Sequence, residues 1–120
     1  MVFVLLTDEN TLVVYDDVAS AIRSCEGIDV EDGVCLFFDD GGQPFEPVFD
    51  RPNQRGRFMV VSGRYHLRQA SEGSQKTLLQ LLPGVMNIEG PPTLTIGEVE
   101  RLLSARSTPD ARKSDASRSP

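Results

Sequence analysis

Three pairs of adjacent carboxylates are the residues of this sequence with the clearest chemical potential. They are Asp16-Asp17, Glu31-Asp32 and Asp39-Asp40. Paired carboxylates can serve a hydrolase as general acid and base, or they can bind a calcium ion. The spacing of an EF-hand loop is absent, however, and Asp is common in turns because its side chain bonds the local backbone. We therefore expect turns and helix starts at these pairs, with no metal site and no cofactor.

Nucleophilic chemistry has few candidate residues in this chain. His66 is the only histidine, and it lies in an alternating segment that predicts an exposed position on a strand. Cys25 and Cys35 both occur among apolar residues, which favours two reduced, buried thiols, although a disulfide between them stays open. No GxSxG, P-loop or GxGxxG pattern is present. We expect a protein that is not an enzyme, with an acid-cluster enzyme as a minor alternative.

Charge is distributed unevenly along the 120 residues, whose formal net charge is −6. Residues 1–50 hold twelve acidic residues and one basic residue (−11), whereas residues 51–120 hold eleven basic and six acidic residues (+5). Packing of the two halves against each other would neutralise part of this charge. Arginines between Arg51 and Arg68 interleave with Phe58 and Tyr65, which leaves nucleic-acid binding as an alternative. The acidic total favours a protein partner with a basic surface instead.

Apolar periodicity predicts the elements that position these residues. The N-terminal half predicts a hairpin at residues 2–6 and 11–15, and then a helix that Asp16 or Asp17 begins and Gly27 ends. A central hairpin follows at residues 34–38 and 45–49. Its first strand is apolar on both sides, which is typical of an interior strand, and Pro44 and Pro47 indicate that its second strand lies at an edge or is bulged.

The second half of the chain predicts another hairpin and two helices. Its elements are strands at 58–61 and 64–69 around a Ser62-Gly63 turn, a helix at 75–82 capped by Ser74, and a final helix with a Thr95/Glu98 capping box.

These elements predict an α+β domain with a mainly antiparallel sheet of about five to six strands and about three helices on one face. Residues 1–106 form this single domain, and residues 107–120 have almost nothing to bury, which predicts a disordered C-terminal tail. No segment approaches the roughly 20 apolar residues of a membrane span. The apolar N-terminus lacks the basic start of a signal peptide, so we expect a cytoplasmic protein.

The central hairpin is the preferred candidate for an interface. Its aromatic side chains belong in the core, whereas the edge position of its second strand makes its carboxylates accessible to a partner. Phe45 is a candidate apolar anchor. The expected partner-binding residues are Glu31, Asp32, Asp39, Asp40, Phe45, Glu46 and Asp50.

Three segments of the chain, read together, resemble a known family. Residues 15–22 (YDDVASAI), 28–33 (IDVEDG) and 38–44 (FDDGGQP) are similar to small acidic bacterial immunity proteins encoded beside polymorphic toxins, delivered by contact or by type VI secretion. The resemblance spans about residues 1–103. It implies a cytoplasmic protein without catalysis of its own, which binds the catalytic domain of its cognate toxin and covers the active site. The alternative is a small accessory or regulatory module that binds another protein or a small ligand.

Overall fold

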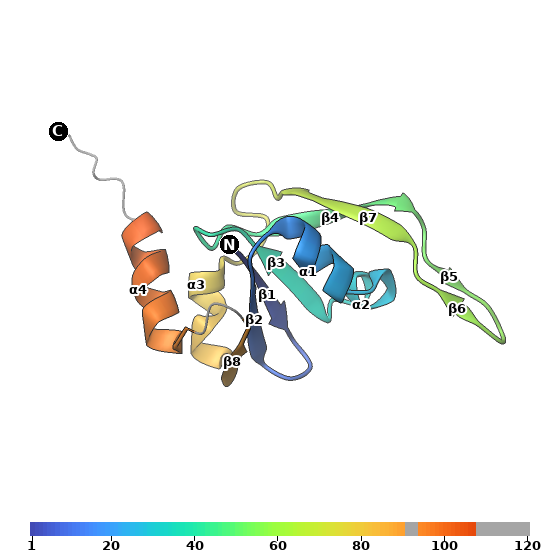
Figure 1. Ribbon diagram of the computed structural model, residues 1–120. Helices are drawn as coiled ribbons and strands as arrows, with labels where there is room; N and C mark the ends of the chain where they lie inside the picture. Colours follow the sequence, from blue (N-terminus) through green and yellow to red (C-terminus); the bar gives the residue numbers. More distant parts are fainter. Residues whose placement is uncertain (91–93, 108–120) are drawn as a thin grey trace.

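The computed structural model describes residues 1–90 and 94–107 (Figure 1). Apart from Ser107, which ends a helix, the predicted C-terminal tail lies outside these residues. The described part is an α+β structure with mostly antiparallel strands, as expected, but it has more strands and helices than predicted. The strands are β1 (Val2–Leu6), β2 (Thr11–Tyr15), β3 (Cys35–Phe38), β4 (Phe45–Arg51), β5 (Gln54–Arg55), β6 (Val60–Val61), β7 (Arg64–Gln69) and β8 (Asn87–Glu89). The α-helices are α1 (Val18–Ser24), α2 (Gly27–Glu31), α3 (Leu78–Leu81) and α4 (Ile96–Ser107), and a 3-10 turn, η1 (Leu82–Gly84), follows α3.

A four-stranded sheet in the order β3-β1-β2-β8 forms the centre of the molecule. The predicted hairpin of β1 and β2 is confirmed, with Val2 opposite Tyr15 and Leu6 opposite Thr11. Asn10 closes its turn at a φ of 52°, a conformation that Asn tolerates better than most residues. Strand β3 pairs antiparallel with β1, and β8 pairs parallel with β2.

The sheet is covered on both faces, so the prediction of helices on one face was wrong. Phe3 and Leu5 of β1 point to one side, where they pack with residues of α3 and α4. Val2 and Val4 point to the other side, where they pack with residues of α1, α2 and β7. The reason is the nearly continuous apolar sequence of β1, because successive side chains of a strand face opposite sides and each side needs a cover.

Strand β3 has the two apolar faces that were predicted, but it lies at an edge of the four-stranded sheet and not inside it. The predicted central hairpin was also wrong, because β4 pairs with β7 along its length and meets β3 only at a Phe38–Pro44 bridge. The prediction that the proline-containing strand lies at an edge or is bulged is confirmed, because β4 pairs with β7 on one side only and its register shifts between Phe49 and Arg51. Strand β4 thus runs in a second layer above the sheet (Figure 1).

Strands β4, β5, β6 and β7 form a long hairpin whose β5–β6 end projects from the body of the molecule, and we call residues 45–69 the arm (Figure 1). Its turn is at Gly56–Met59, where the Gly56 amide bonds the Met59 carbonyl at 2.7 Å, and not at Ser62-Gly63 as predicted. Gly63 instead passes so close to the Arg51 carbonyl that a Cβ atom would collide with it. Gly63 is therefore required by close backbone approach, a role that the sequence does not distinguish from a turn.

Helix caps follow the sequence closely in two places. The Asp17 carboxylate accepts the Ser20 amide at 2.8 Å at the start of α1, and Thr95 and Glu98 form the predicted capping box of α4. Thr77, and not Ser74, caps the helix that follows the arm. Gly27 begins α2 and does not end α1 as predicted. Its backbone is packed against Asn53 and Gly63. In the described residues, no helix has the length and apolarity that crossing a membrane requires.

Candidate interaction surface

Ion pairs join the acidic and basic halves of the chain. Each of the four that the described residues form links a carboxylate before residue 51 to a base after it: Glu31–Arg55, Asp32–Arg55, Asp50–His66 and Glu46–Arg68. All of these side chains are substantially exposed, so each pair adds little to stability. The pairs matter here because they neutralise part of the predicted acidic surface.

Helix α2 and the arm are fastened together at Glu31 and Asp32. Arg55 donates to Glu31 at 3.1 Å and to Asp32 at 2.8 Å. The Asn53 amide donates to Glu31 at 3.1 Å and to the Gly27 carbonyl at 3.0 Å, while its side-chain oxygen accepts the Gly63 amide. The hydrogen bonds from Asn53 and Arg55 hold the pKa of Glu31 below its ordinary value. This latch gives both carboxylates a defined orientation.

Asp39 has a structural role in the turn between β3 and β4. One carboxylate oxygen accepts the amides of Gly41 and Gln43, both at 2.9 Å, and the other accepts the Gln69 side chain at 3.0 Å. Such a turn forms because an Asp side chain can satisfy the backbone amides that follow it. Its neighbour Asp40 is exposed in the same turn. Asp39 is therefore occupied inside the chain and is a poor contact for a partner.

The remaining predicted residues lie along β4. Glu46 and Asp50 are on its outer side, where they pair with Arg68 and His66 of β7. The exposed position expected for His66 is confirmed. Phe45 faces the opposite way and packs half-buried against the core, so it is not available as a free apolar anchor. The structure thus brings Glu31 and Asp32 together and leaves the others apart from them.

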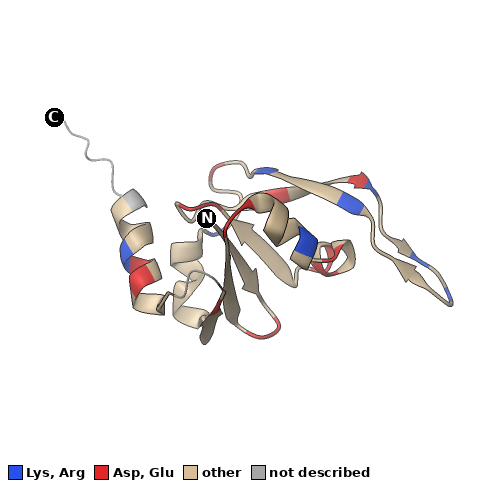
Figure 2. Ribbon diagram, in the orientation of Figure 1, with Lys and Arg blue, Asp and Glu red and all other residues tan. Residues whose placement is uncertain are grey.

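Two acidic residues that sequence reasoning missed lie beside Glu31 and Asp32. Glu26 is the N-cap residue of α2 and Asp29 lies in its first turn; both are exposed and neither joins an ion pair within the described ranges. We call Glu26, Asp29, Glu31 and Asp32 the acidic flank. Figure 2 shows acidic positions, in red, on the ribbon of α2 beside the arm. The sequence feature that could have identified them is Gly27. It was interpreted as the end of the preceding helix, whereas it begins α2, the helix that carries the acidic flank.

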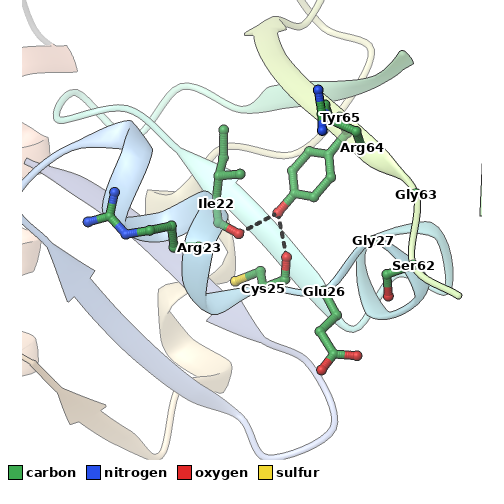
Figure 3. A pocket seen from close by; sticks show the side chains of 9 residues that line it. All are labelled: Ile22, Arg23, Cys25, Glu26, Gly27, Ser62, Gly63, Arg64 and Tyr65. Atoms are coloured by element: carbon green, nitrogen blue, oxygen red, sulfur yellow. Dashed lines mark hydrogen bonds between the residues drawn. The ribbon is translucent and has the colours of Figure 1, made fainter. Parts of the chain in front are cut away.

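A shallow cavity of about 260 Å³ lies between the end of α1, α2 and the arm. Figure 3 shows the Tyr65 ring forming one wall, with its hydroxyl group directed at the backbone carbonyls of Ile22 and Cys25. Its lining residues include the charged residues Arg23, Glu26 and Arg64. Burial raises the pKa of Tyr65, so its hydroxyl stays protonated as a hydrogen-bond donor. This cavity lies where the arm meets the body, and its lining residues include both basic and acidic side chains.

Cys25 and Cys35 are buried and free, as expected. Interaction with the neighbouring Cys25 thiol, together with burial, raises the pKa of Cys35. Interaction with the Cys35 thiol lowers the pKa of Cys25, because an S–H group can stabilise a thiolate beside it. The pair packs in the core under β3 and is not placed as a nucleophile.

The end of the arm carries the largest exposed apolar surface of the described residues. Phe58 is 93% exposed, and Met59 and Val60 are 66% and 60% exposed. Sequence reasoning assigned these residues to a paired strand, because their types are those of a strand. We call residues 56–61 the arm tip, and its charged side chain is Arg57, whose guanidinium lies 5.6 Å from the centre of the Phe58 ring.

Comparisons with protein-family models, curated proteins and solved structures found no match to this chain. No group of three or more His, Cys, Asp or Glu side chains suited to a metal ion occurs in residues 1–90 and 94–107. The candidate surface therefore consists of the acidic flank with the adjoining base of the arm.

Proposed function

We propose that this protein is a cytoplasmic binding protein that neutralises a bacterial toxin domain by covering its active site with the acidic flank. The observation that carries the proposal is the latch of Asn53 and Arg55, which holds Glu31 and Asp32 beside two further exposed carboxylates. A surface whose side chains are already oriented loses less conformational freedom on binding. The resemblance to immunity proteins supplies the class of partner.

Charge determines what such a partner presents. The flank has four carboxylates and one compensating guanidinium, so it attracts a protein with a basic cleft. Electrostatic attraction of this kind acts mainly on the association rate and weakens as salt screens it. Asp39 is held by the turn, and Glu46 and Asp50 are paired along β4. The contacts that we assign to the partner are therefore those of the acidic flank.

A binding experiment with matched charge reversals tests the proposal. The protein encoded by the neighbouring open reading frame is produced, and its association with this protein is measured at low and at physiological salt. The double variant Glu26→Lys/Asp29→Lys is expected to associate about tenfold more slowly at low salt, with a smaller difference at high salt. The control Glu72→Lys/Glu89→Lys makes the same change of net charge at sites outside the flank.

Two outcomes contradict the proposal. One is the absence of a complex between the two proteins at micromolar concentration, together with unchanged toxin activity. The other is an equal loss of association rate in the two double variants, which would assign the attraction to net charge and not to the flank.

A small-ligand module is the second candidate function, and the cavity beside Tyr65 is the feature that favours it. Its volume of about 260 Å³ is just below the range of roughly 300–1,000 Å³ that is typical of ligand sites. A small anionic or zwitterionic molecule would suit the Arg23 and Arg64 side chains among its lining residues. Stabilisation of the purified protein against heat by such a molecule, in the absence of any partner protein, would favour this function.

A further inference from the structure

The geometry points to self-association: the arm tip of one copy binds an apolar pocket at the opposite end of a second copy of this chain. The tip contributes Phe58 and Arg57. The pocket lies between α3, η1 and α4, and its lining includes Leu79, Ile96 and Glu100. These residues are distinct from the acidic flank, so this inference stands or falls independently of the proposed function.

The pocket is large enough for the phenyl ring of the tip, and five of its six lining residues are apolar. Its volume is about 330 Å³, and its other lining residues are Leu82, Pro83 and Val85. An apolar cavity of about 150 Å³ is enough to hold benzene, so a phenyl ring can enter this pocket. Removing the Phe58 side chain from water is the main gain, because it is 93% exposed in the single copy.

Charge matches at the same contact. Glu100 is the only charged residue that lines the pocket, and no ion pair within the described residues involves it. Arg57 forms no ion pair there either, whereas Arg55 is already held by Glu31 and Asp32. With Phe58 in the pocket, the adjacent Arg57 is within reach of the Glu100 carboxylate of the other copy, where the two charges complement each other.

The positions of the two surfaces allow the contact to form twice. The arm tip and the α3–α4 region lie at opposite ends of the molecule, whose longest extent is 60 Å (Figure 1). Two copies that lie side by side in opposite directions therefore bring each arm tip next to the pocket of the other. This is a closed two-fold dimer, in which the same pair of surfaces is used twice.

A second copy is favoured over an anionic membrane or a nucleic acid as the occupant. The chain has a formal charge of −6, which repels anionic surfaces, and Arg57 is the only arginine of the arm tip. Another copy supplies both features that the tip requires, an apolar pocket and a carboxylate at that pocket.

Sedimentation velocity of the purified full chain, from about 1 to 500 µM, tests the inference. We expect a concentration-dependent monomer–dimer equilibrium, and at least a tenfold weaker dimer for each of the variants F58S, R57E and E100R. An equimolar mixture of R57E and E100R is the decisive sample, because both contacts of a mixed dimer are then complementary in charge. Dimer formation is expected to return in this mixture to within about threefold of the unmodified protein.

The control is the double variant R57E/E89R, which restores the net charge of the unmodified chain on β8 but leaves the contact at Glu100 repulsive. Dimer recovery in this double variant equal to that in the mixture of R57E and E100R would overturn the inference, as would a monomer at every concentration. Assemblies that grow beyond the dimer would overturn the closed arrangement. Binding to vesicles of anionic phospholipid that R57E abolishes, without self-association, would assign the tip to a membrane and overturn the inference. Circular dichroism of each variant confirms that the exposed substitutions leave the fold intact.

Discussion

The hydroxyl group of Tyr65 donates a hydrogen bond of 2.7 Å to the backbone carbonyl of Cys25, 40 residues earlier in the chain. This bond connects β7 of the arm to the residue that ends α1 (Figure 3). Phe37 and Phe49 pack against the same ring at centroid distances of 6.0 and 5.6 Å. Tyr65 thus belongs to the arm by sequence and to the body by packing, and it anchors the arm to the body.

Replacing Tyr65 by Phe removes this bond without changing the ring. The Cys25 carbonyl then loses its short hydrogen bond from the hydroxyl in a buried setting, which costs about 1–3 kcal/mol. Urea denaturation should show that loss as a lower midpoint with an unchanged slope. Tyr15→Phe is the matched control, since no hydrogen bond from the half-buried Tyr15 hydroxyl is found in the described residues, and it should change the free energy of unfolding by less than about 0.5 kcal/mol. Equal effects of the two variants would contradict the assigned role.

Replacing Gly63 by Ala tests the close approach of the two sides of the arm. A Cβ atom at this position collides with the Arg51 carbonyl and with the Pro52 backbone, and backbone atoms cannot move aside as a flexible side chain can. We expect a loss of at least about 2 kcal/mol in the free energy of unfolding, or faster hydrogen exchange along β7 if the arm separates from the body.

Gly84→Ala is the control for this substitution. Its Cβ atom would meet nothing within 4 Å, so the added methyl group should be neutral or slightly stabilising. A Gly63→Ala protein as stable as the unmodified one, with unchanged exchange in β7, would contradict the packing of this joint.

Acid should loosen the latch between α2 and the arm. The pKa of Glu31 is lower in the folded protein than its ordinary value of 4.5, because Asn53 and Arg55 bond its carboxylate. Its contribution is therefore fully present above pH 4.5 and is lost as the pH falls through the lowered folded-state pKa. The melting temperature of Glu31→Gln should accordingly fall less than that of the unmodified protein between about pH 6 and pH 3.

Glu26→Gln provides the comparison for this pH dependence. Glu26 is an exposed carboxylate of the same helix, and its side chain makes no cap hydrogen bond. Its replacement should leave the acid-dependent fall in melting temperature close to that of the unmodified protein. A Glu31→Gln protein with the full acid dependence would show that the latch does not contribute to stability.

Local patterns predicted the elements whose cause is local. The β-branched and apolar residues of 2–6 and 11–15 give the first hairpin, and the capping residues Asp17, Thr95 and Glu98 lie where the chain needs them. The alternation in residues 64–69 also predicted correctly that His66 is exposed. The hairpin and the caps depend on neighbours within a few residues.

Pairing between distant segments was predicted less well. Residues 45–49 have the composition of a strand, but the sequence does not specify whether β3 or β7 is their partner, and a short turn wrongly favoured β3. The roles of Gly27 and Gly63 were ambiguous for a similar reason. Both glycines are required because two backbone segments approach each other there, and this approach occurs only once the arm has folded onto α2. Helix α2 was missed for that reason, and with it Glu26 and Asp29.

The sequence by itself determined the α+β class, the apolar segments of the core, the local caps and the separation of acidic from basic residues. Only the tertiary structure decided which charges remain available to a partner, because Arg55, His66 and Arg68 approach their carboxylates when the arm packs back on the body. It also decided that Phe45 is half-buried against the core and that Phe58 is exposed, although both are phenylalanines in strand-like segments. Burial depends on what lies across from a side chain in space, and that is a property of contacts between residues far apart in the chain.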